Sequence, residues 1–445
     1  MRFIDLFAGL GGFHRALAEL GHECVFASEI DDELRAIYTR NFPEVADHVF
    51  GDIREFKSKI PPHEILCGGF PCQPFSKSGQ QLGLQDETRG TLFHEILEVL
   101  ATHRPKYVIL ENVGNFERHD GGRTWSIVYQ RLDDLGYSVQ GTVHKASGGH
   151  GLISPHHFGH PHHRERFFIV AIHQEPLASD PFPRGNRKEV TSLTDIVQGQ
   201  GELTERDVVE TRLSPKQVAC IDLWNRLLEK LPADIEPPSI PLWGDEITAK
   251  YPFEDDIPFT IARDELLLTT ELDESQPAFW EALQNKLDHL PSYARAEVFP
   301  KWKRDFIRGN RTWFRAVHQY FPDGWVDELL AFPPSLRKLE WNCKGEVRDL
   351  WQHMLQFRPS GLRVKRYSSV PALVAMTTTQ IPVLGPERRF LTRTEGLKLQ
   401  GFPPSHELPR SRERAFASLG NAVHVNVVKR VAEKLFTPDE ELEGC

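Results

Sequence analysis

The stretch RFIDLFAGLGGFHRALAELGHECVFASE, residues 2–29, decides the fold. Its apolar run at 2–7 predicts a buried strand, and the glycine-rich turn AGLGG follows that strand directly. Residues 14–20 have apolar side chains at helical spacing, and a second apolar run at 23–29 predicts the next strand. Strand, tight turn, helix and strand in this order indicate the first unit of a parallel sheet whose faces are covered by helices.

The same alternation continues outward from this stretch. A helical pattern at 418–435 restores it near the other end of the chain. We therefore predict an α/β fold with a Rossmann-like, doubly wound sheet that is formed from both chain ends. The elements predicted between these ends are helix 31–42, strand 64–69, helix 91–103, strand 106–112 and strand 164–172.

The middle of the chain is more weakly patterned. We expect residues 1–174 and 388–445 to form one domain, and residues 175–387 to form a smaller inserted region. Within the insert, residues 175–300 are rich in proline and acidic side chains, whereas residues 301–387 are basic. The sequence thus predicts a discontinuous domain that is interrupted by a second one.

The net charge of −10 conceals this division. Residues 231–300 carry 15 acidic and 4 basic side chains, whereas residues 301–366 carry 14 basic and 7 acidic ones. The charge of the whole chain therefore excludes no polyanionic partner. No apolar run approaches ~18 residues and no leader pattern is present, so we expect no membrane helix. The six cysteines form no CxxC pair, which predicts no metal centre and a reducing cytoplasm.

The glycine turn indicates a nucleoside-type ligand. It has neither the lysine of a P-loop nor the GxGxxG order of a dinucleotide fingerprint, but its backbone N–H groups can approach a ligand closely. Glu29 ends the second strand, where a carboxylate typically accepts from ribose hydroxyls. Asp52, in the GDI segment, can accept from an adenine amino group. An ordinary tight turn with two surface acids is the alternative interpretation.

Two further motifs indicate a nucleophile and an acid. GGFPCQPFS, residues 68–76, places Cys72 in a proline-stiffened turn after a strand. Glu111 follows the apolar run KYVIL, where burial disfavours the ionised carboxyl and lets it act as an acid near neutrality. Arg164 and Arg166 alternate in RER, so both can face one side of a strand and approach Glu111. An inert, packed thiol and a surface carboxylate paired with a base are the alternatives.

These groups together suit covalent chemistry on a cytosine ring. Attack of a thiolate on carbon 6 makes carbon 5 able to take a methyl group, and a carboxylic acid can protonate ring nitrogen 3. An arginine can hold the ring carbonyl oxygen. Because a cytosine inside a duplex cannot be reached, it must be flipped out of the helix.

On nine motifs the chain resembles the DNA cytosine-5 methyltransferases that use S-adenosylmethionine, of the prokaryotic restriction-modification type. In the family's order these are DLFAGLGGF, SEID, GDI, GGFPCQPFS, RGTLFHEI, ENV, RERFF, LKLQGFP and GNAV. They lie at both ends of the chain. The insert corresponds to the family's target-recognition domain, and no motif match is found there.

The resemblance implies roles for single residues. Cys72 is expected to be the nucleophile and Glu111 the acid at nitrogen 3, while Arg166 holds the base oxygen and Arg164 supports the site. The expected cofactor-binding residues are Phe7, Gly9, Leu10, Gly11, Gly12, Glu29, Ile30, Asp52, Ile53, Pro71, Leu92, Asn421 and Val423. The expected DNA contacts are Ser76, Ser78, Arg89, Arg363, Lys365 and Arg366.

The basic run at 301–315 has two interpretations. It is either a helix with a solvated basic face or a phosphate-binding segment. In the second case Lys301, Lys303 and Arg304 would contact phosphates while the acidic residues 231–300 face away.

Three positions depart from the family pattern. His162 stands where the family usually has glutamine, and Thr394-Glu395 replaces an arginine–glutamate pair before LQGFP. His424 follows GNAV, where most members have proline or a small apolar residue. None of these positions belongs to the expected chemistry.

The resemblance also implies a context. The expected partner is double-stranded DNA, with a restriction endonuclease acting on the same sequence without direct contact. We expect a monomer in the cytoplasm of a prokaryote, associated with the nucleoid through DNA. Methylation of cytosine in RNA and a catalytically silent DNA-binding relative are the alternatives.

Overall fold

The computed structural model describes residues 1–70, 91–145, 149–238, 240–374 and 380–437. The chain divides into two compact units. Unit 1 contains Met1–Glu210, Ser368–Ile381 and Leu391–Cys445, and unit 2 contains Thr211–Tyr367 and Pro382–Phe390. Unit 1 is therefore built from both ends of the chain.

A seven-stranded sheet with the order β3-β2-β1-β4-β5-β8-β6 forms the centre of unit 1. Neighbouring strands from β3 to β5 pair in parallel, and β8 is antiparallel to both β5 and β6. The predicted Rossmann-like sheet is confirmed. The sequence analysis missed strand β6, because this short edge strand has no apolar run. The strands are β1 (Arg2–Leu6), β2 (Glu23–Ser28), β3 (Val49–Phe50), β4 (Ile65–Gly69), β5 (Tyr107–Val113), β6 (Tyr137–Gly141) and β8 (Arg166–His173).

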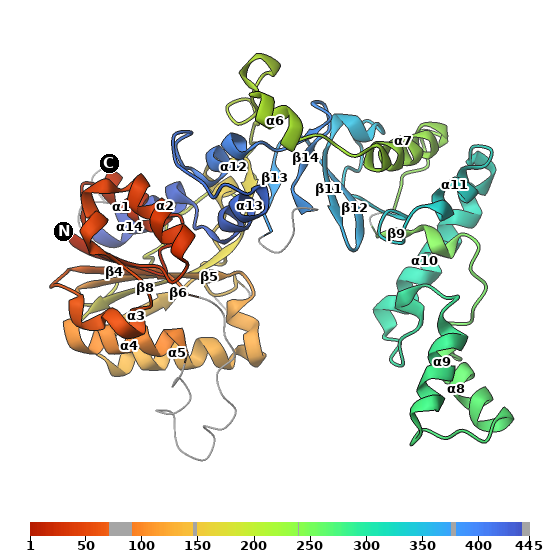
Figure 1. Ribbon diagram of the computed structural model, residues 1–445, viewed down its shortest axis with the longest axis horizontal. Helices are drawn as coiled ribbons and strands as arrows, with labels where there is room; N and C mark the ends of the chain where they lie inside the picture. The colour runs from red at the N-terminus through yellow and green to blue at the C-terminus, as the bar shows by residue number, and fades with distance from the viewer. Residues whose placement is uncertain (71–90, 146–148, 239, 375–379, 438–445) are drawn as a thin grey trace. The chain divides into compact units, whose positions relative to one another are not determined.

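Helices cover both faces of this sheet. Figure 1 shows α4 and α5 below the sheet and α1, α2 and α14 above it. The C-terminal helix α14 packs against α1, which brings the two chain ends together. The helices are α1 (Gly12–Glu19), α2 (Asp32–Asn41), α3 (Ile53–Phe56), α4 (Leu92–His103), α5 (Arg123–Asp134), α6 (Glu205–Glu210), α12 (Arg393–Gln400), α13 (Arg412–Asn421) and α14 (Val425–Phe436).

Residues 175–210 belong to unit 1, although the sequence assigned them to the insert. The backbone N–H of Gln198 donates to Glu395 at 2.8 Å, and Arg393 forms an ion pair with Glu210 at 2.8 Å. These bonds join the segment to α12, which lies far along the chain. The boundary between the units therefore falls later than the weakening of the sequence pattern.

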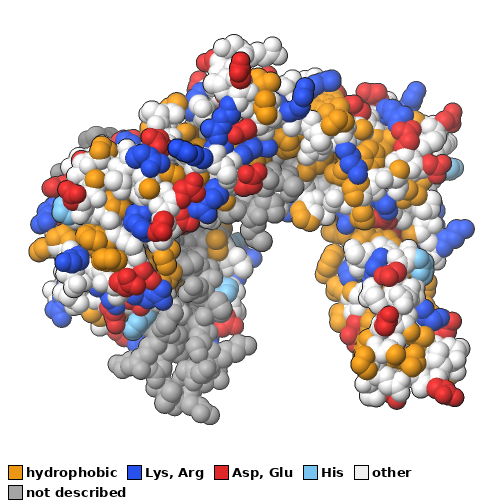
Figure 2. Space-filling model, viewed as in Figure 1, with side chains coloured by type: hydrophobic (Ala, Val, Ile, Leu, Met, Phe, Trp, Pro, Cys, Tyr) orange, Lys and Arg blue, Asp and Glu red, His pale blue; other side chains and the backbone are white. Residues whose placement is uncertain are grey.

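Unit 2 contains a six-stranded sheet with the order β15-β14-β11-β12-β10-β9. Its strands are β9 (Leu242–Trp243), β10 (Lys338–Trp341), β11 (Met354–Arg358), β12 (Gly361–Lys365), β14 (Val383–Leu384) and β15 (Arg389–Phe390). Its helices are α7 (Pro215–Lys230), α8 (Pro258–Thr269), α9 (Pro277–Leu287), α10 (Lys301–Val317) and α11 (Trp325–Ala331). Helices α8 and α9 share a small core, and Figure 2 shows hydrophobic side chains exposed on the visible face of this pair.

The arginines of the basic helix α10 form ion pairs and hydrogen bonds within unit 2. Arg311 forms an ion pair with Glu246 at 2.7 Å, and Arg308 pairs with Glu254 at 3.1 Å. Arg304 donates to the carbonyl oxygens of Phe299 and Glu254. The phosphate-binding interpretation required the acidic segment to face away from this helix, and the ion pairs of Glu246 and Glu254 with α10 contradict that arrangement.

Two expected absences concern membranes and metals. Within the described ranges, no helix is long and apolar enough to cross a bilayer. In the same residues, no three His, Cys, Asp or Glu side chains are arranged to hold a metal ion.

Candidate active site

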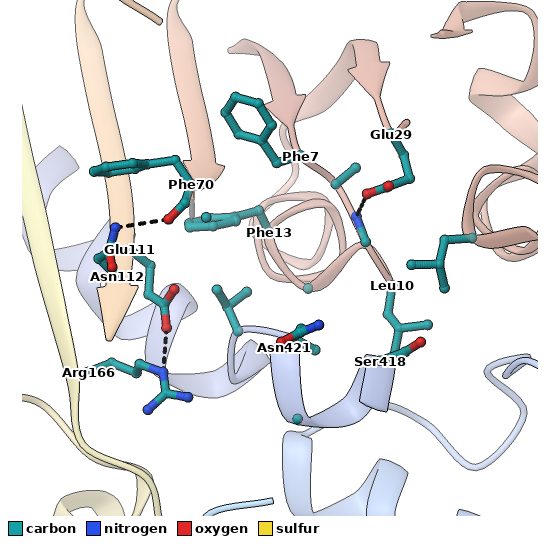
Figure 3. Close-up of a pocket in the computed structure, with 18 of the residues that line it drawn as sticks. Phe7, Leu10, Phe13, Glu29, Phe70, Glu111, Asn112, Arg166, Ser418 and Asn421 are labelled. Atoms are coloured by element: carbon teal, nitrogen blue, oxygen red, sulfur yellow. Dashed lines mark hydrogen bonds and ion pairs between the residues drawn. The ribbon is translucent and has the colours of Figure 1, made fainter. Parts of the chain in front are cut away.

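A pocket of about 360 Å³ opens at the carboxyl ends of the central strands of unit 1. In doubly wound sheets this edge is where ligands bind. Figure 3 shows side chains from the glycine turn, β5 and the C-terminal helices converging on it. The predicted residues that line it are Phe7, Gly9, Leu10, Gly12, Glu29, Glu111, Arg164, Arg166, Asn421 and Val423.

The glycine turn is held in a conformation that lets a ligand approach its backbone closely. Phe7 has a φ of 58°, which is unfavourable for a bulky side chain and is typical of functional sites. The Gly9 N–H donates to Glu29 at 2.8 Å, so this carboxylate stays at the pocket edge. A Cβ on Gly12 would lie 2.6 Å from the Val423 side chain, which makes glycine necessary where the two chain ends meet.

Glu111 and Arg166 form an ion pair at the pocket floor. The Arg166 Nε lies 2.9 Å from Glu111 Oε1, and the Glu111 side chain is 8% exposed. Arg166 is opposite Val113 in the antiparallel β5–β8 pair, so it is the diagonal neighbour of Glu111 on one sheet face. Glu111 Oε1 receives no well-aligned hydrogen bond from the described residues. It therefore keeps capacity to bond a ligand.

Arg164 does not share this ion pair, contrary to the expectation that both arginines approach Glu111. It precedes β8, is 2% exposed and donates to the carbonyl oxygens of Gly420 and Ala422, both at 2.8 Å. Burial lowers the pKa of Arg164 to about 9, with Arg166 as a further cause. Arg164 thus fastens the chain around Asn421 to the sheet.

Asn112 is a site residue that the sequence analysis did not single out. Its Nδ2 donates to the carbonyl oxygen of Phe70 at 2.9 Å, and its Oδ1 accepts from the Val113 N–H. The side chain therefore holds the end of β4 against the end of β5. The ENV motif contained the signal, but a hydrogen bond to a residue 42 positions away cannot be read from a motif.

Other expected cofactor residues lie beside this pocket. Ile30 and Asp52 line a second depression, while Ile53 is buried at the start of α3. Asp52 caps α3 and pairs with Arg54, whose hydrogen bond lowers the pKa of Asp52. Gly11 and Leu92 do not line either cavity. A Cβ on Gly11 would overlap the rings of Phe42 and Tyr38.

Five predicted residues lie outside the described part of the chain. They are Pro71, Cys72, Ser76, Ser78 and Arg89.

The expected DNA contacts in unit 2 lie on β12 and just after it. Arg363 and Lys365 alternate with the fully buried Leu362 and Val364, so the two cations share the opposite sheet face. Arg363 lies 2.9 Å from Glu340 on the neighbouring β10. Burial and Arg363 lower the pKa of Lys365. Arg366 pairs with Glu346 at 2.6 Å beyond the strand end.

Comparison with known proteins identifies the family. The family model for C-5 cytosine-specific DNA methylases matches residues 1–224 and 333–437, and the chain belongs to this family. The match extends into the insert, where no motif match had been found, but leaves out residues 225–332. The chain is accordingly a DNA cytosine-5 methyltransferase by family.

Individual relatives are of the same kind. Type II methyltransferase M.AluI of Cellulosimicrobium cellulans is 32% identical over 99% of this chain and 92% of its own length. M.HhaI of Haemophilus parahaemolyticus is 43% identical over 39% of this chain and 50% of its own. A solved structure of a Spodoptera frugiperda DNMT2 mutant aligns with a TM-score of 0.44 at 16% identity, over 98% of this chain and 99% of that one.

Proposed function

We propose that this enzyme transfers a methyl group from S-adenosylmethionine to carbon 5 of a flipped-out cytosine in a specific double-stranded DNA sequence. The observation that carries the proposal is the buried Glu111–Arg166 pair at the floor of the pocket. A carboxylate with unused bonding capacity, beside a guanidinium, can hold one polar edge of a flipped base.

The pocket residues fit the proposed cofactor. Glu29 offers a carboxylate for ribose hydroxyls at the end of β2, and Phe7 offers an aromatic face. Gly9 keeps the turn free of side-chain atoms, so backbone can approach the ligand. When bound, S-adenosylmethionine supplies an electrophilic methyl group.

Three residues of the chain are proposed to carry out the other steps of the reaction. In this proposal the Cys72 thiolate forms a bond to carbon 6 of the cytosine, while Glu111 donates a proton to ring nitrogen 3. Arg166 holds the ring carbonyl oxygen and keeps Glu111 in place. Loss of the carbon 5 proton after methylation lets the sulfur leave, which restores both the ring and Cys72.

The polar face of β12 is the proposed DNA-reading surface of unit 2. Arg363 and Lys365 supply donors that match guanine edges in a major groove. Ser76, Ser78, Arg89 and Arg366 are proposed as further contacts. We propose that the enzyme acts as a monomer in a prokaryotic cytoplasm at the nucleoid, and protects DNA from a restriction endonuclease of the same specificity.

Methylation assays test the proposal. Purified enzyme and labelled S-adenosylmethionine should methylate duplex DNA at one recurring sequence, and bisulfite sequencing should place the methyl group on carbon 5 of one cytosine. A transfer RNA substrate is the control. Labelling of RNA in preference to duplex DNA would overturn the proposed substrate.

A further inference from the structure

Two of the three departures from the family pattern meet inside unit 1. His162 lies in the short strand β7 (His162–His163) and is fully buried. His424 is the residue before α14 and is 4% exposed. Their ring centroids are 6.2 Å apart, although 262 positions separate them in the sequence. The two substitutions therefore share one environment.

The hydrogen bonds at this place are incomplete. His162 Nδ1 lies 3.0 Å from the Leu399 carbonyl oxygen, so Nδ1 carries the proton and Nε2 is left as an acceptor. Among the described residues, His162 Nε2, both nitrogens of His424 and Gln400 Oε1 have no well-aligned hydrogen-bond partner. The Leu399 carbonyl oxygen is nevertheless close enough to His424 to raise its pKa, against the larger lowering caused by burial. At 6.2 Å between centroids the two imidazoles are too far apart to bond each other directly.

Two residues that are close in sequence to these groups hold one wall of the pocket: Gln400, which follows Leu399, and Arg164, which lies two positions after His162. The Gln400 Nε2 donates to the Leu419 carbonyl oxygen, and Arg164 donates to those of Gly420 and Ala422. Asn421 and Val423, the residues between and after these carbonyls, line the pocket. An interaction that fixes the side chains of these residues therefore also fixes the positions of Asn421 and Val423 in the pocket wall.

We propose that His162 and His424 share a bound water, and that the two histidines together position the pocket wall for the methyl donor. A water between the two rings can donate to His162 Nε2 while it accepts from an N–H of His424. A metal ion would suit this place poorly, because the Arg164 guanidinium belongs to the same cluster. The role in donor binding rests on the proposed function, whereas the water site does not.

Paired substitutions test the coupling. His162→Leu should raise the KM for S-adenosylmethionine about tenfold, the scale of one lost buried hydrogen bond, with kcat and the KM for DNA nearly unchanged. His424→Leu should have the same effect. The double variant should be no worse than either single one, because one water serves both rings. Losses that multiply in the double variant would overturn the coupling.

Conservative and neighbouring variants supply the controls. His162→Gln keeps a donor and an acceptor, so its KM should stay close to that of the unaltered enzyme. His163→Gln changes the adjacent, exposed histidine of β7 and should leave every constant unaltered. A KM for His162→Gln as high as that for His162→Leu would contradict a hydrogen-bonding role.

A structural measurement remains decisive if a leucine variant fails to fold. A crystal structure of the unaltered enzyme that resolves waters should show one within hydrogen-bond distance of His162 Nε2 and His424. A dry site would overturn the inference. Calorimetry separates the two proposals: an unaltered enzyme that binds no S-adenosylmethionine refutes the proposed function, whereas equal binding by enzyme and leucine variants refutes only the role of the histidines.

Discussion

At the scale of single residues, we expect two cysteines that are close in sequence, Cys67 and Cys72, to differ in reactivity. Cys67 is fully buried in β4, its Sγ donates to the Ile4 carbonyl oxygen at 3.2 Å, and burial raises its pKa well above the usual value. A thiol held in this way stays protonated and is not a nucleophile. Cys72 carries the proposed chemistry, which leaves Cys67 as its matched control.

Trapping with a fluorinated substrate distinguishes these cysteines. Duplex DNA that carries 5-fluorocytosine at the target should form a denaturation-resistant complex, because fluorine blocks the final elimination. Cys72→Ala should abolish both the complex and turnover while S-adenosylmethionine still binds. Cys67→Ala should retain trapping and lose only about 1–2 kcal/mol of stability from the small cavity. Trapping that survives in Cys72→Ala would exclude it as the nucleophile.

The role proposed for Glu111 is one that a neutral isostere cannot fill. Glu111→Gln removes the proton donor and the charge partner of Arg166 but keeps the shape of the pocket floor. We expect turnover to fall about 100-fold or more, with S-adenosylmethionine affinity retained. Single-turnover assays measure the rate, and Glu165→Gln, a change of the exposed neighbour of Arg166, is the control. Near-normal turnover in Glu111→Gln would refute the role.

At the scale of elements, α10 is a structural helix whose cations are used inside unit 2. The Glu246 carboxylate is fully buried, and the Arg311 side chain that pairs with it also lies over the rings of Tyr251 and Phe253. The pairing fastens the acidic segment before α8 to the basic helix. The basic side chains of α10 therefore pair within the unit, whereas the sequence alone was equally compatible with their binding DNA phosphates.

Removing this partner should affect stability. Arg311→Ala leaves Glu246 charged and buried without its cation, so we expect a loss of about 3–5 kcal/mol in the free energy of unfolding. Urea denaturation measures it, and Arg315→Ala on the exposed side of the same helix is the control. An unchanged stability together with weaker DNA binding would show that Arg311 is a phosphate contact instead.

The β12 strand should behave in the opposite way. Arg363 is partly exposed on the polar sheet face, and Glu340 fixes its guanidinium there. If it reads a guanine, Arg363→Ala should cost about 1–3 kcal/mol of binding to the recognised duplex and relax the sequence at one position. Titration of recognised and scrambled duplexes measures both. An equal loss on every sequence would make Arg363 a phosphate contact.

At the scale of the whole molecule, four buried histidines predict how stability varies with pH. Burial lowers the pKa of His14 to about 3 and those of His63, His157 and His406 to about 4. The unfolded chain binds protons at these histidines near pH 6.5, whereas the folded chain does not. Their stabilisation is therefore complete above about pH 6.5 and is lost as the pH falls towards 4. Asp5 opposes this trend, because burial raises its pKa.

The expected loss is about 1 kcal/mol for each of these histidines between pH 7.5 and 5.5. Urea unfolding at the two pH values measures it. His63→Gln should reduce the pH dependence, and replacement of the exposed His48 by glutamine should not. A stability that rises as the pH falls over this range would contradict the assignment.

The sequence by itself determined most of the strands and helices of unit 1 and most of the pocket, although it missed α5 and β6. Apolar runs and helical spacing are local properties, and the glycine turn, Glu29 and Glu111 follow strands directly, so their meeting at one sheet edge follows from a parallel sheet. The second unit was harder to predict because three of its strands have only two residues, and four α-helices separate β9 from β10. The basic pattern of its helix α10 is compatible both with ion pairs inside the unit and with binding to DNA phosphates.

Only the tertiary structure decided which distant groups meet. Arg164 grips the carbonyl oxygens of Gly420 and Ala422 instead of Glu111, and His162 faces His424 across the same junction. Each of these contacts joins residues more than 200 positions apart. No spacing rule reaches that far, because such pairs form only where the C-terminal helices return to the sheet and the burial of both partners selects the bonds that they make.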